Sequence, residues 1–187
     1  MALPEGFIQI SNRVRNWGRW GDDDQLGTLN FITPEVVRNA AECIRTGESF
    51  PLSVTLEKEG IQVGFIPGRI NPILEMISID EPIDAEAGLD SFHTSDDVVQ
   101  MGLQAATHWD GLCHASYNGF VYNGYPSETI TSSEGATRCG IENLRAVCSR
   151  GVLLDVARAK GVDILECPYA ITAKDLDDAA GLGNVEI

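Results

Sequence analysis

Residues 107–114 read Thr-His-Trp-Asp-Gly-Leu-Cys-His and hold two of the chain's three histidines, with one carboxylate between them. Neutral imidazole and carboxylate are side chains that Zn²⁺, Mn²⁺ and Fe²⁺ accept as ligands. Because His108 and Asp110 are two residues apart, both project from one face of an extended segment. In a helix they would point to nearly opposite sides. The spacing therefore predicts a pair of metal ligands at a strand end or in a loop.

His114 is the third chemically active side chain of this segment. Gly111 can relax the backbone after Asp110, so that His114 returns toward the same point. An imidazole titrates near neutrality, which suits an acid or a base in catalysis. Two other interpretations stay open: His108 and Asp110 as a structural hydrogen-bonded pair, and His114 as a core or surface imidazole.

Other side chains near the segment each admit two interpretations. Gln104 can hydrogen-bond to a metal ligand or have no role. Trp109 lies on the opposite pleat from the ligands, which favours core packing over substrate stacking. A buried thiol is favoured over a nucleophile for Cys113. His93 is expected at the surface in a loop, with a role at the substrate mouth as the alternative.

Two helices are expected on either side of this segment. The first starts at Pro34, with Thr33 as its N-cap, carries an apolar stripe to Ile44 and stops before Gly47. The second covers residues 173–180, capped by Thr172 and ended by Gly181.

Strands are expected at three places. A strand over residues 98–106 leads into the His/Asp segment, and shorter strands are expected at 51–56 and 151–156. Residues 57–95 contain Gly, Pro and acidic stretches, and irregular excursions around a substrate mouth are expected there. A turn is expected at 119–124.

The first 31 residues are expected to form a turn-rich N-terminal arm. Residues 12–31 are dense in Trp, Gly, Asp and Asn, and Trp17 and Trp20 are expected to hold the arm in place. The arm could equally be a lid or an oligomer contact. With Phe31, the two tryptophans could also line a site for an aryl substrate, although a hydrophobic anchor is the default.

Size and charge limit the class of protein. The 187 residues, 43% of them hydrophobic, are enough for a single domain with a core. A formal net charge of −15 disfavours nucleic acid and anionic membranes as partners. Five widely spaced cysteines without a Cys-x-x-Cys pair indicate free thiols in a reducing compartment. With no apolar run long enough to span a membrane, a cytoplasmic protein is expected.

Residues 104–114, Gln-Ala-Ala-Thr-His-Trp-Asp-Gly-Leu-Cys-His, resemble the signature of the metal-dependent cyclase family. This family includes bacterial kynurenine formamidases and isatin hydrolase, and its pattern is His-x-Gly-Thr-His-x-Asp-x-Pro-x-His. The arm at 20–30 and residues 117–125 also resemble the longer members of the family. Gln104 replaces the first histidine of the pattern, Ala106 the glycine and Leu112 the proline.

The resemblance implies an α/β fold, the swivelling β/β/α domain of the kynurenine formamidase type, with a mixed sheet and peripheral helices. It implies a homo-oligomer that binds a divalent metal, Zn or Mn, through His108 and Asp110. Gln104 would be a weak ligand or lie outside the coordination sphere, which argues for one metal. His114 would be the acid/base. The family takes further ligands from later in its domain, so residues 1–187 are expected to be one domain that is incomplete at its C-terminus.

The expected activity is hydrolysis of a C–N amide bond, as in the conversion of N-formylkynurenine to kynurenine and formate. A divalent metal lowers the pKa of water and polarises an amide carbonyl. The expected substrate is a small aryl amide or a cyclic amide. Alternatives are a cyclic amide or lactone hydrolase of the isatin hydrolase type, or a truncated homologue without catalysis that serves as a binding or assembly unit.

Overall fold

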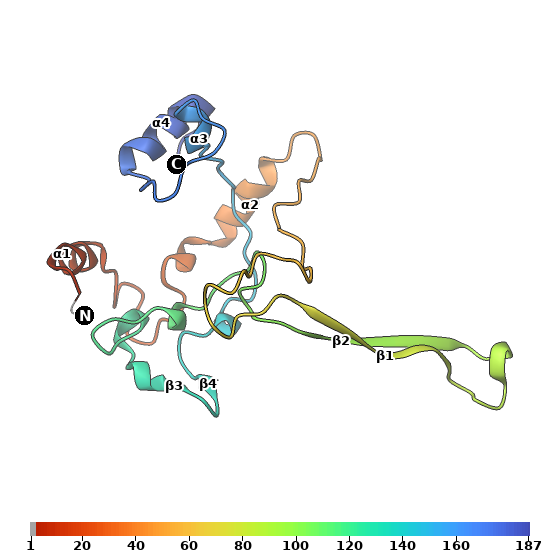
Figure 1. The fold of residues 1–187 in the computed structure, drawn as a ribbon. Helices are drawn as coiled ribbons and strands as arrows, with labels where there is room; N and C mark the ends of the chain where they lie inside the picture. The colour runs from red at the N-terminus through yellow and green to blue at the C-terminus, as the bar shows by residue number, and fades with distance from the viewer. Residues whose placement is uncertain (1–2) are drawn as a thin grey trace. The chain divides into compact units, whose positions relative to one another are not determined.

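The computed structural model describes residues 3–187, which divide into two compact units. One unit joins Met1–Gly47 to Asn143–Ile187, and the other is Glu48–Glu142. The His/Asp segment lies entirely in the second unit. None of the described helices has the length and apolarity that a membrane crossing requires. The predicted α/β class is confirmed, and the described strands form two antiparallel two-stranded sheets (Figure 1). The prediction of one domain stays a prediction.

The first predicted helix is confirmed as α2, Pro34–Glu42. The Thr33 hydroxyl accepts the Val36 N–H at 3.3 Å, as expected of an N-cap. The helix ends earlier than predicted. The Cys43 N–H turns back to the Ala40 carbonyl at 3.1 Å, so the last turn tightens before Gly47 is reached.

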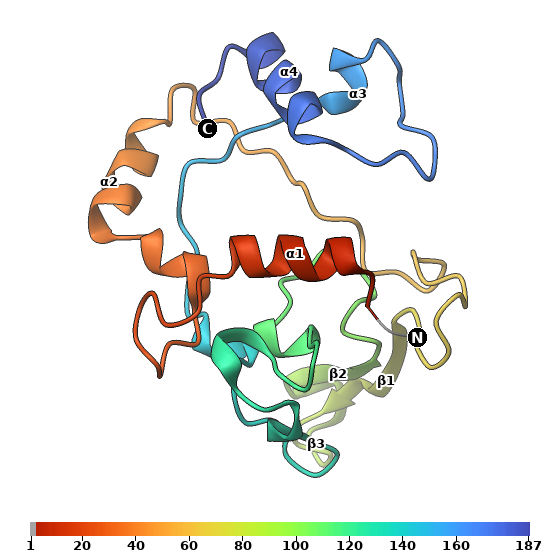
Figure 2. The same ribbon diagram turned by 90° about the vertical axis from the view of Figure 1, so that its left-hand side faces the viewer.

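The second predicted helix is confirmed as α4, Ala173–Gly183, and it packs beside the short helix α3, Val156–Ala159 (Figure 2). Thr172 and Asp175 form a reciprocal capping box at its start. The predicted stop at Gly181 is wrong. Asn184 takes the left-handed conformation at φ 49° and ends the helix instead.

Helix α1, Glu5–Val14, was not predicted, because the glycines and tryptophans that follow it favoured turns. The rest of the arm is turn-rich as expected and contains the 3-10 helix η1, Gly27–Phe31. The Trp20 and Phe31 rings meet edge to face with centroids 5.2 Å apart. The Arg19 guanidinium lies 4.8 Å from the Phe31 centroid. The contact between Trp20 and Phe31 therefore joins two parts of the arm to each other.

The long hairpin in the second unit pairs β1, Ile73–Pro82, with β2, His93–Gln100. Its register runs from Ile73↔Gln100 to Pro82↔His93. The predictions of irregular chain over 57–95 and of a strand over 98–106 are therefore wrong in part. Strand β1 begins directly after Asn71-Pro72. Strand β2 stops early because the chain turns: the Gly102 N–H bonds to the Ile70 carbonyl at 3.1 Å.

The two shorter predicted strands are absent from the part of the chain that the structure describes. At 51–56 the Val54 N–H bonds to the Thr107 hydroxyl at 3.0 Å rather than to a neighbouring strand. At 151–156 the chain is irregular up to Asp155, whose carboxylate caps α3 by accepting the Arg158 N–H at 3.0 Å. In both places side chains satisfy backbone groups that the strand prediction assigned to a sheet.

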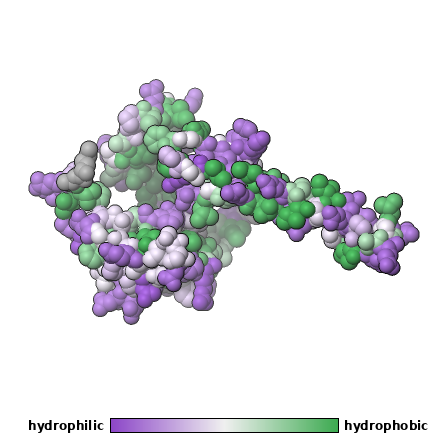
Figure 3. Space-filling view, turned by 60° about the horizontal axis from the view of Figure 1, so that its bottom comes forward, coloured by the Kyte–Doolittle hydropathy of each residue, from purple (hydrophilic) through white to green (hydrophobic). Residues whose placement is uncertain are grey.

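The long hairpin exposes apolar side chains on both faces, and Figure 3 shows some of them along its length. Leu74 and Val99 are paired across the strands and are 65% and 52% exposed, while Val98 pairs with Glu75 on the opposite face. A free two-stranded hairpin is marginally stable in water. Among the described helices and strands, β1 and β2 chiefly contact each other.

A small core supports the His/Asp segment in the second unit. Cys113, Val121 and Cys139 are buried together, and Tyr122, Tyr125 and Ala136 pack against them. Three short 3-10 helices belong to this region: η3 (Leu112–His114), η4 (Tyr122–Gly124) and η5 (Ser127–Thr129). A small hairpin follows them, formed by β3 (Ile130–Thr131) and β4 (Gly135–Ala136). The predicted turn at 119–124 is confirmed.

His93 is more enclosed than expected, with a side chain that is 17% exposed at the start of β2. Its Nδ1 lies 2.8 Å from the Asp80 carbonyl oxygen, and its Nε2 lies 3.0 Å from the Gly88 carbonyl oxygen, in the 3-10 helix η2, Gly88–Asp90. Because both ring nitrogens face acceptors, the protonated ring makes both bonds. The bond to Gly88, followed by that to Asp80, raises the pKa of His93 above its ordinary value.

We expect the tip of the long hairpin to be more stable at acid than at alkaline pH. The pKa of His93 is raised in the folded state. Its contribution to the stability of the hairpin tip is therefore fully present below the unfolded pKa of His and is lost as the pH rises through the folded pKa. Amide exchange at Ile83, whose N–H bonds to the Phe92 carbonyl, measures this, with His93→Gln compared at each pH. A His93 ring that titrates below the ordinary value in NMR would contradict the prediction.

We also expect Asp175→Asn to lower the thermal stability of the α3–α4 pair. The buried Asp175 carboxylate accepts bonds from Lys160 Nζ at 2.6 Å, Tyr169 OH at 2.9 Å and the Thr172 N–H at 2.8 Å. The Lys160 ammonium holds the pKa of Asp175 well below its usual range, so this stabilisation is present above the unfolded pKa of Asp and is lost as the pH falls from there toward the folded pKa. The matched control is Asp178→Asn, which breaks an exposed pair with Lys174. Equal melting temperatures for the two variants would refute the prediction.

Candidate metal and catalytic site

The predicted ligand pair lies in a loop, as its spacing indicated. Residues 108–110 have no regular secondary structure and lead into η3, Leu112–His114. Ala105 and Ala106 are 1% and 7% exposed and anchor the chain just before the loop. The loop is thus held at both ends, by these alanines and by the buried Cys113.

Gly111 serves a different purpose from the one predicted. Its φ of −71° and ψ of 146° are open to any residue, so no relaxed backbone is needed there. A Cβ atom at this position would instead lie 3.0 Å from the Ile141 nitrogen and 3.2 Å from the Cys139 carbonyl oxygen. Glycine therefore allows the backbone at 139–141 to approach the site closely, where the Cys113 N–H donates to the Cys139 carbonyl at 3.0 Å.

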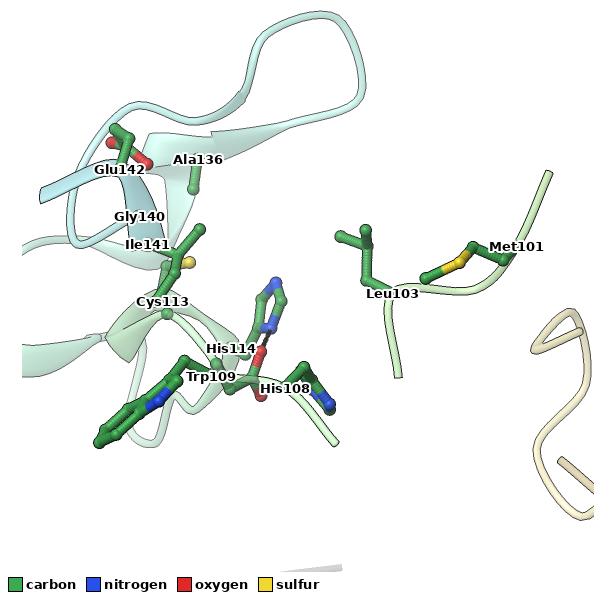
Figure 4. A pocket seen from close by; sticks show the side chains of 12 residues that line it. Met101, Leu103, His108, Trp109, Cys113, His114, Ala136, Gly140, Ile141 and Glu142 are labelled. Atoms are coloured by element: carbon green, nitrogen blue, oxygen red, sulfur yellow. Dashed lines mark hydrogen bonds and ion pairs between the residues drawn. The ribbon is translucent and has the colours of Figure 1, made fainter. Parts of the chain in front are cut away.

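Asp110 and His114 are brought together directly. His114 Nδ1 bonds to an Asp110 carboxylate oxygen, and the two side chains are 46% and 50% exposed. A carboxylate that accepts from Nδ1 leaves Nε2 as the free lone pair of the neutral ring. Figure 4 shows the His114 ring reaching into the pocket. This is the arrangement in which an imidazole can take up and return a proton.

His108 has the tautomer expected of a metal ligand. Its Nδ1 lies 2.9 Å from the Ala106 carbonyl oxygen, so Nδ1–H donates and Nε2 keeps its lone pair. Gln104 is half-buried, and its backbone carbonyl accepts a bond from the Gln62 side chain. Within residues 3–187, no three or more His, Cys, Asp or Glu side chains form a group that could hold a metal. The donor chemistry of His108 and Asp110 suits a divalent metal, but they do not complete its coordination.

The pocket around these residues encloses about 400 Å³ (Figure 4). His108, Asp110 and His114 line it together with the apolar side chains of Leu103 and Ile141. Such a volume falls near the lower end of small-molecule pockets, roughly 300–1,000 Å³.

Glu142 also lines the pocket and escaped the sequence analysis. It belongs to the 3-10 helix η6, Ile141–Asn143. No motif surrounds it, and only the close approach of this backbone to Gly111 brings it to the pocket. The sequence offered no signal that could have found it.

Two neighbouring side chains are now placed. Cys113 is 5% exposed, and burial raises the pKa of its thiol, so the predicted buried thiol is confirmed. Trp109 points away from His108 and His114, as the alternation predicted (Figure 4). However, Trp109 is 62% exposed, and the prediction that it packs in a core is therefore wrong.

Gly111→Ala is expected to destabilise the second unit. The added Cβ overlaps backbone that is fixed by the core, and overpacking of this kind costs roughly 1–3 kcal/mol. Gly181→Ala is the matched control, because nothing lies within 4 Å of its Cβ in helix α4 and alanine favours a helix. Thermal unfolding should show opposite shifts for the two variants. If Gly111→Ala left the melting temperature unchanged, the close approach of the two backbone segments would not matter for stability.

Comparison with known proteins identifies the family. The cyclase family model matches residues 18–187. A crystal structure described as that of a novel cyclase matches with a TM-score of 0.81 and 37% sequence identity, over 92% of this chain. The chain spans 58% of the length of that structure. No curated protein matched the chain. The signature at 104–114, the structural match and the family model over most of the sequence agree, and the chain belongs to the cyclase family.

Proposed function

We propose that the protein is a metal-dependent hydrolase of a C–N amide bond, of the arylformamidase type. The observation that carries this proposal is the convergence of His108, Asp110 and His114 on one pocket, with Nε2 of both imidazoles available. Membership of the cyclase family supports an enzyme. Zn or Mn as the metal and a homo-oligomeric assembly belong to the same proposal.

His108 and Asp110 would hold the metal. Nε2 of His108 is the donor atom, and the Ala106 carbonyl fixes the orientation of the ring. The free oxygen of Asp110 is the second donor, while its other oxygen bonds to His114. Further donors must come from outside this pair. When bound, a divalent metal supplies Lewis acidity and lowers the pKa of water at this point.

His114 would move the protons of the reaction. Its Nε2 accepts a proton from the attacking water as the new C–O bond forms at the amide carbon. The same proton is then returned to the amide nitrogen as the C–N bond breaks, so that a carboxylic acid and an amine leave. Asp110 holds Nδ1 of His114 and keeps Nε2 directed at the substrate.

A hydrolase of cyclic amides or lactones is the second candidate. It is favoured by Gln104, which stands where the formamidase pattern has a histidine and which supports a site for one metal rather than two. The Gln104 backbone carbonyl accepts a bond from the Gln62 side chain. The chemistry required of His114 is the same for either substrate.

The test is hydrolysis of N-formylkynurenine and of isatin by the full-length protein with added Zn²⁺ or Mn²⁺. His108→Ala is expected to lower both metal content and kcat. His114→Ala is expected to keep the metal but to lower kcat by about 10²–10⁴-fold, because only proton transfer is lost. Metal content is measured by mass spectrometry.

The control variant is His93→Gln, which changes a histidine outside the pocket and should leave kcat unchanged. A protein that hydrolyses neither compound with either metal would overturn the proposal. That result would favour a homologue without catalysis that acts in binding or assembly.

A further inference from the structure

The turn that leads from β2 into the His/Asp segment is attached to one neighbouring stretch of chain. Its own bond runs from the Ala105 N–H to the Gly102 carbonyl at 3.0 Å. From outside the turn, the Gly102 N–H donates to the Ile70 carbonyl at 3.1 Å. The Gln104 carbonyl accepts a second bond, from the side-chain amide of Gln62. The two stretches are therefore joined at two points.

Gln62 is itself held in place by the side chain of Asn71. The Gln62 N–H donates to Asn71 Oδ1 at 2.9 Å, and Asn71 Nδ2 donates to the Gln62 carbonyl at 2.9 Å. The chain comes this close because Gly60 has no side chain: a Cβ atom there would lie 2.9 Å from Asn71 Oδ1. Both backbone groups of Gln62 are thus occupied, and its side chain reaches the turn.

The stretch that follows the turn ends at the carbonyl that orients His108. Gln104 is followed by Ala105 and Ala106, which are 1% and 7% exposed and have no polar side-chain group. The Ala106 carbonyl then accepts the His108 Nδ1–H at 2.9 Å. The bond from Gln62 therefore attaches this stretch from outside the pocket, which Gln62 does not line.

We propose that Gln62 is a positioning residue for His108. By holding the Gln104 carbonyl, it keeps the Ala106 carbonyl aimed at Nδ1 of the imidazole, so that Nε2 stays the atom that can bind a metal. A neutral imidazole carries its proton on either nitrogen unless a hydrogen bond selects one. A looser Ala106 carbonyl would leave Nε2 protonated part of the time, and a protonated Nε2 cannot bind a metal. The proposal rests on the proposed function, because it concerns a ligand of the same site.

Two variants of Gln62 remove the donor and keep the length of the side chain. Gln62→Glu carries a carboxylate, which only accepts hydrogen bonds at neutral pH, and Gln62→Met carries neither a donor nor a charge. Gln104 is half-buried, so water can replace the lost donor and both variants should fold.

The first measurement is nitrogen NMR of the imidazoles in the full-length protein before any metal is added, above the ordinary pKa of His. The His108 signal is the one that disappears in His108→Ala. Its ring is expected to be mainly Nδ1–H in the parent protein and a mixture of the two tautomers in Gln62→Glu and Gln62→Met.

The second measurement is the Kd for Zn²⁺, obtained by calorimetry. Both variants are expected to bind Zn²⁺ about tenfold more weakly, because groups that orient a histidine ligand contribute roughly that much or more to metal affinity. Gln62→Lys is the rescue variant, since its ammonium restores an N–H donor on a long side chain. It should return the His108 tautomer and the Kd toward the parent values.

The matched control is Gln100→Glu, which adds the same charge at an exposed position at the end of β2, outside the pocket. It should leave the His108 tautomer and the Kd unchanged. The proposal would be overturned by an unaltered tautomer in both Gln62→Glu and Gln62→Met, by an equal shift in the control, or by a failure of Gln62→Lys to restore the parent tautomer.

These outcomes are distinct from those that test the proposed function. A His108 tautomer that depends on Gln62, in a protein that hydrolyses no amide, would refute the hydrolase and support the positioning role. Amide hydrolysis by the parent protein, with a tautomer that neither Gln62→Glu nor Gln62→Met alters, would support the hydrolase and refute the positioning role.

Discussion

The bond from the Cys113 N–H to the Cys139 carbonyl, made possible by the missing side chain of Gly111, is the constraint on which the site depends. It brings together two segments that are far apart in sequence. Cys113 and Cys139 are both buried against Val121, so the bond forms away from water, where it is strong. With this contact in place, His114 on one segment and Ile141 on the other border a common pocket.

The orientation of the two imidazoles follows from local hydrogen bonds rather than from deep burial. His108 and His114 each use Nδ1 within the loop, on the Ala106 carbonyl and the Asp110 carboxylate respectively. Each therefore keeps Nε2 for chemistry. Both acceptors lie within four residues of the histidines they orient, so residue types and spacing alone were enough to single out this segment.

The rest of the site could not be predicted, because it depends on contacts between distant segments. Nothing near Glu142 marks it as a pocket residue, and the role of Gly111 required knowing which backbone approaches it. Trp109 was correctly placed opposite the ligands, but whether a neighbour covers that side is a tertiary property that alternation does not contain.

The helices and strands differ in the same way: elements fixed by local hydrogen bonds were predicted, and elements that depend on distant partners were not. Helices α2 and α4 begin where predicted, because Thr33 and Thr172 cap them through bonds spanning three residues. The strands were misplaced because their partners are distant. Apolar content suggested a strand at 51–56, yet Val54 bonds to Thr107. Strand β1 pairs with a strand that begins only at His93, beyond an intervening loop.

The long hairpin has a consequence for colloidal behaviour. Its two strands leave both outer edges unpaired, and such edges can join to those of another molecule. Between Ile73 and Gln100 the sequence contains Asp and Glu repeatedly but no Lys or Arg, so neighbouring hairpins repel one another at neutral pH. As the pH falls and these carboxylates become protonated, this repulsion weakens while the apolar side chains stay exposed. Acidity thus removes the electrostatic protection of the strand edges, and the hairpin becomes the place where aggregation begins.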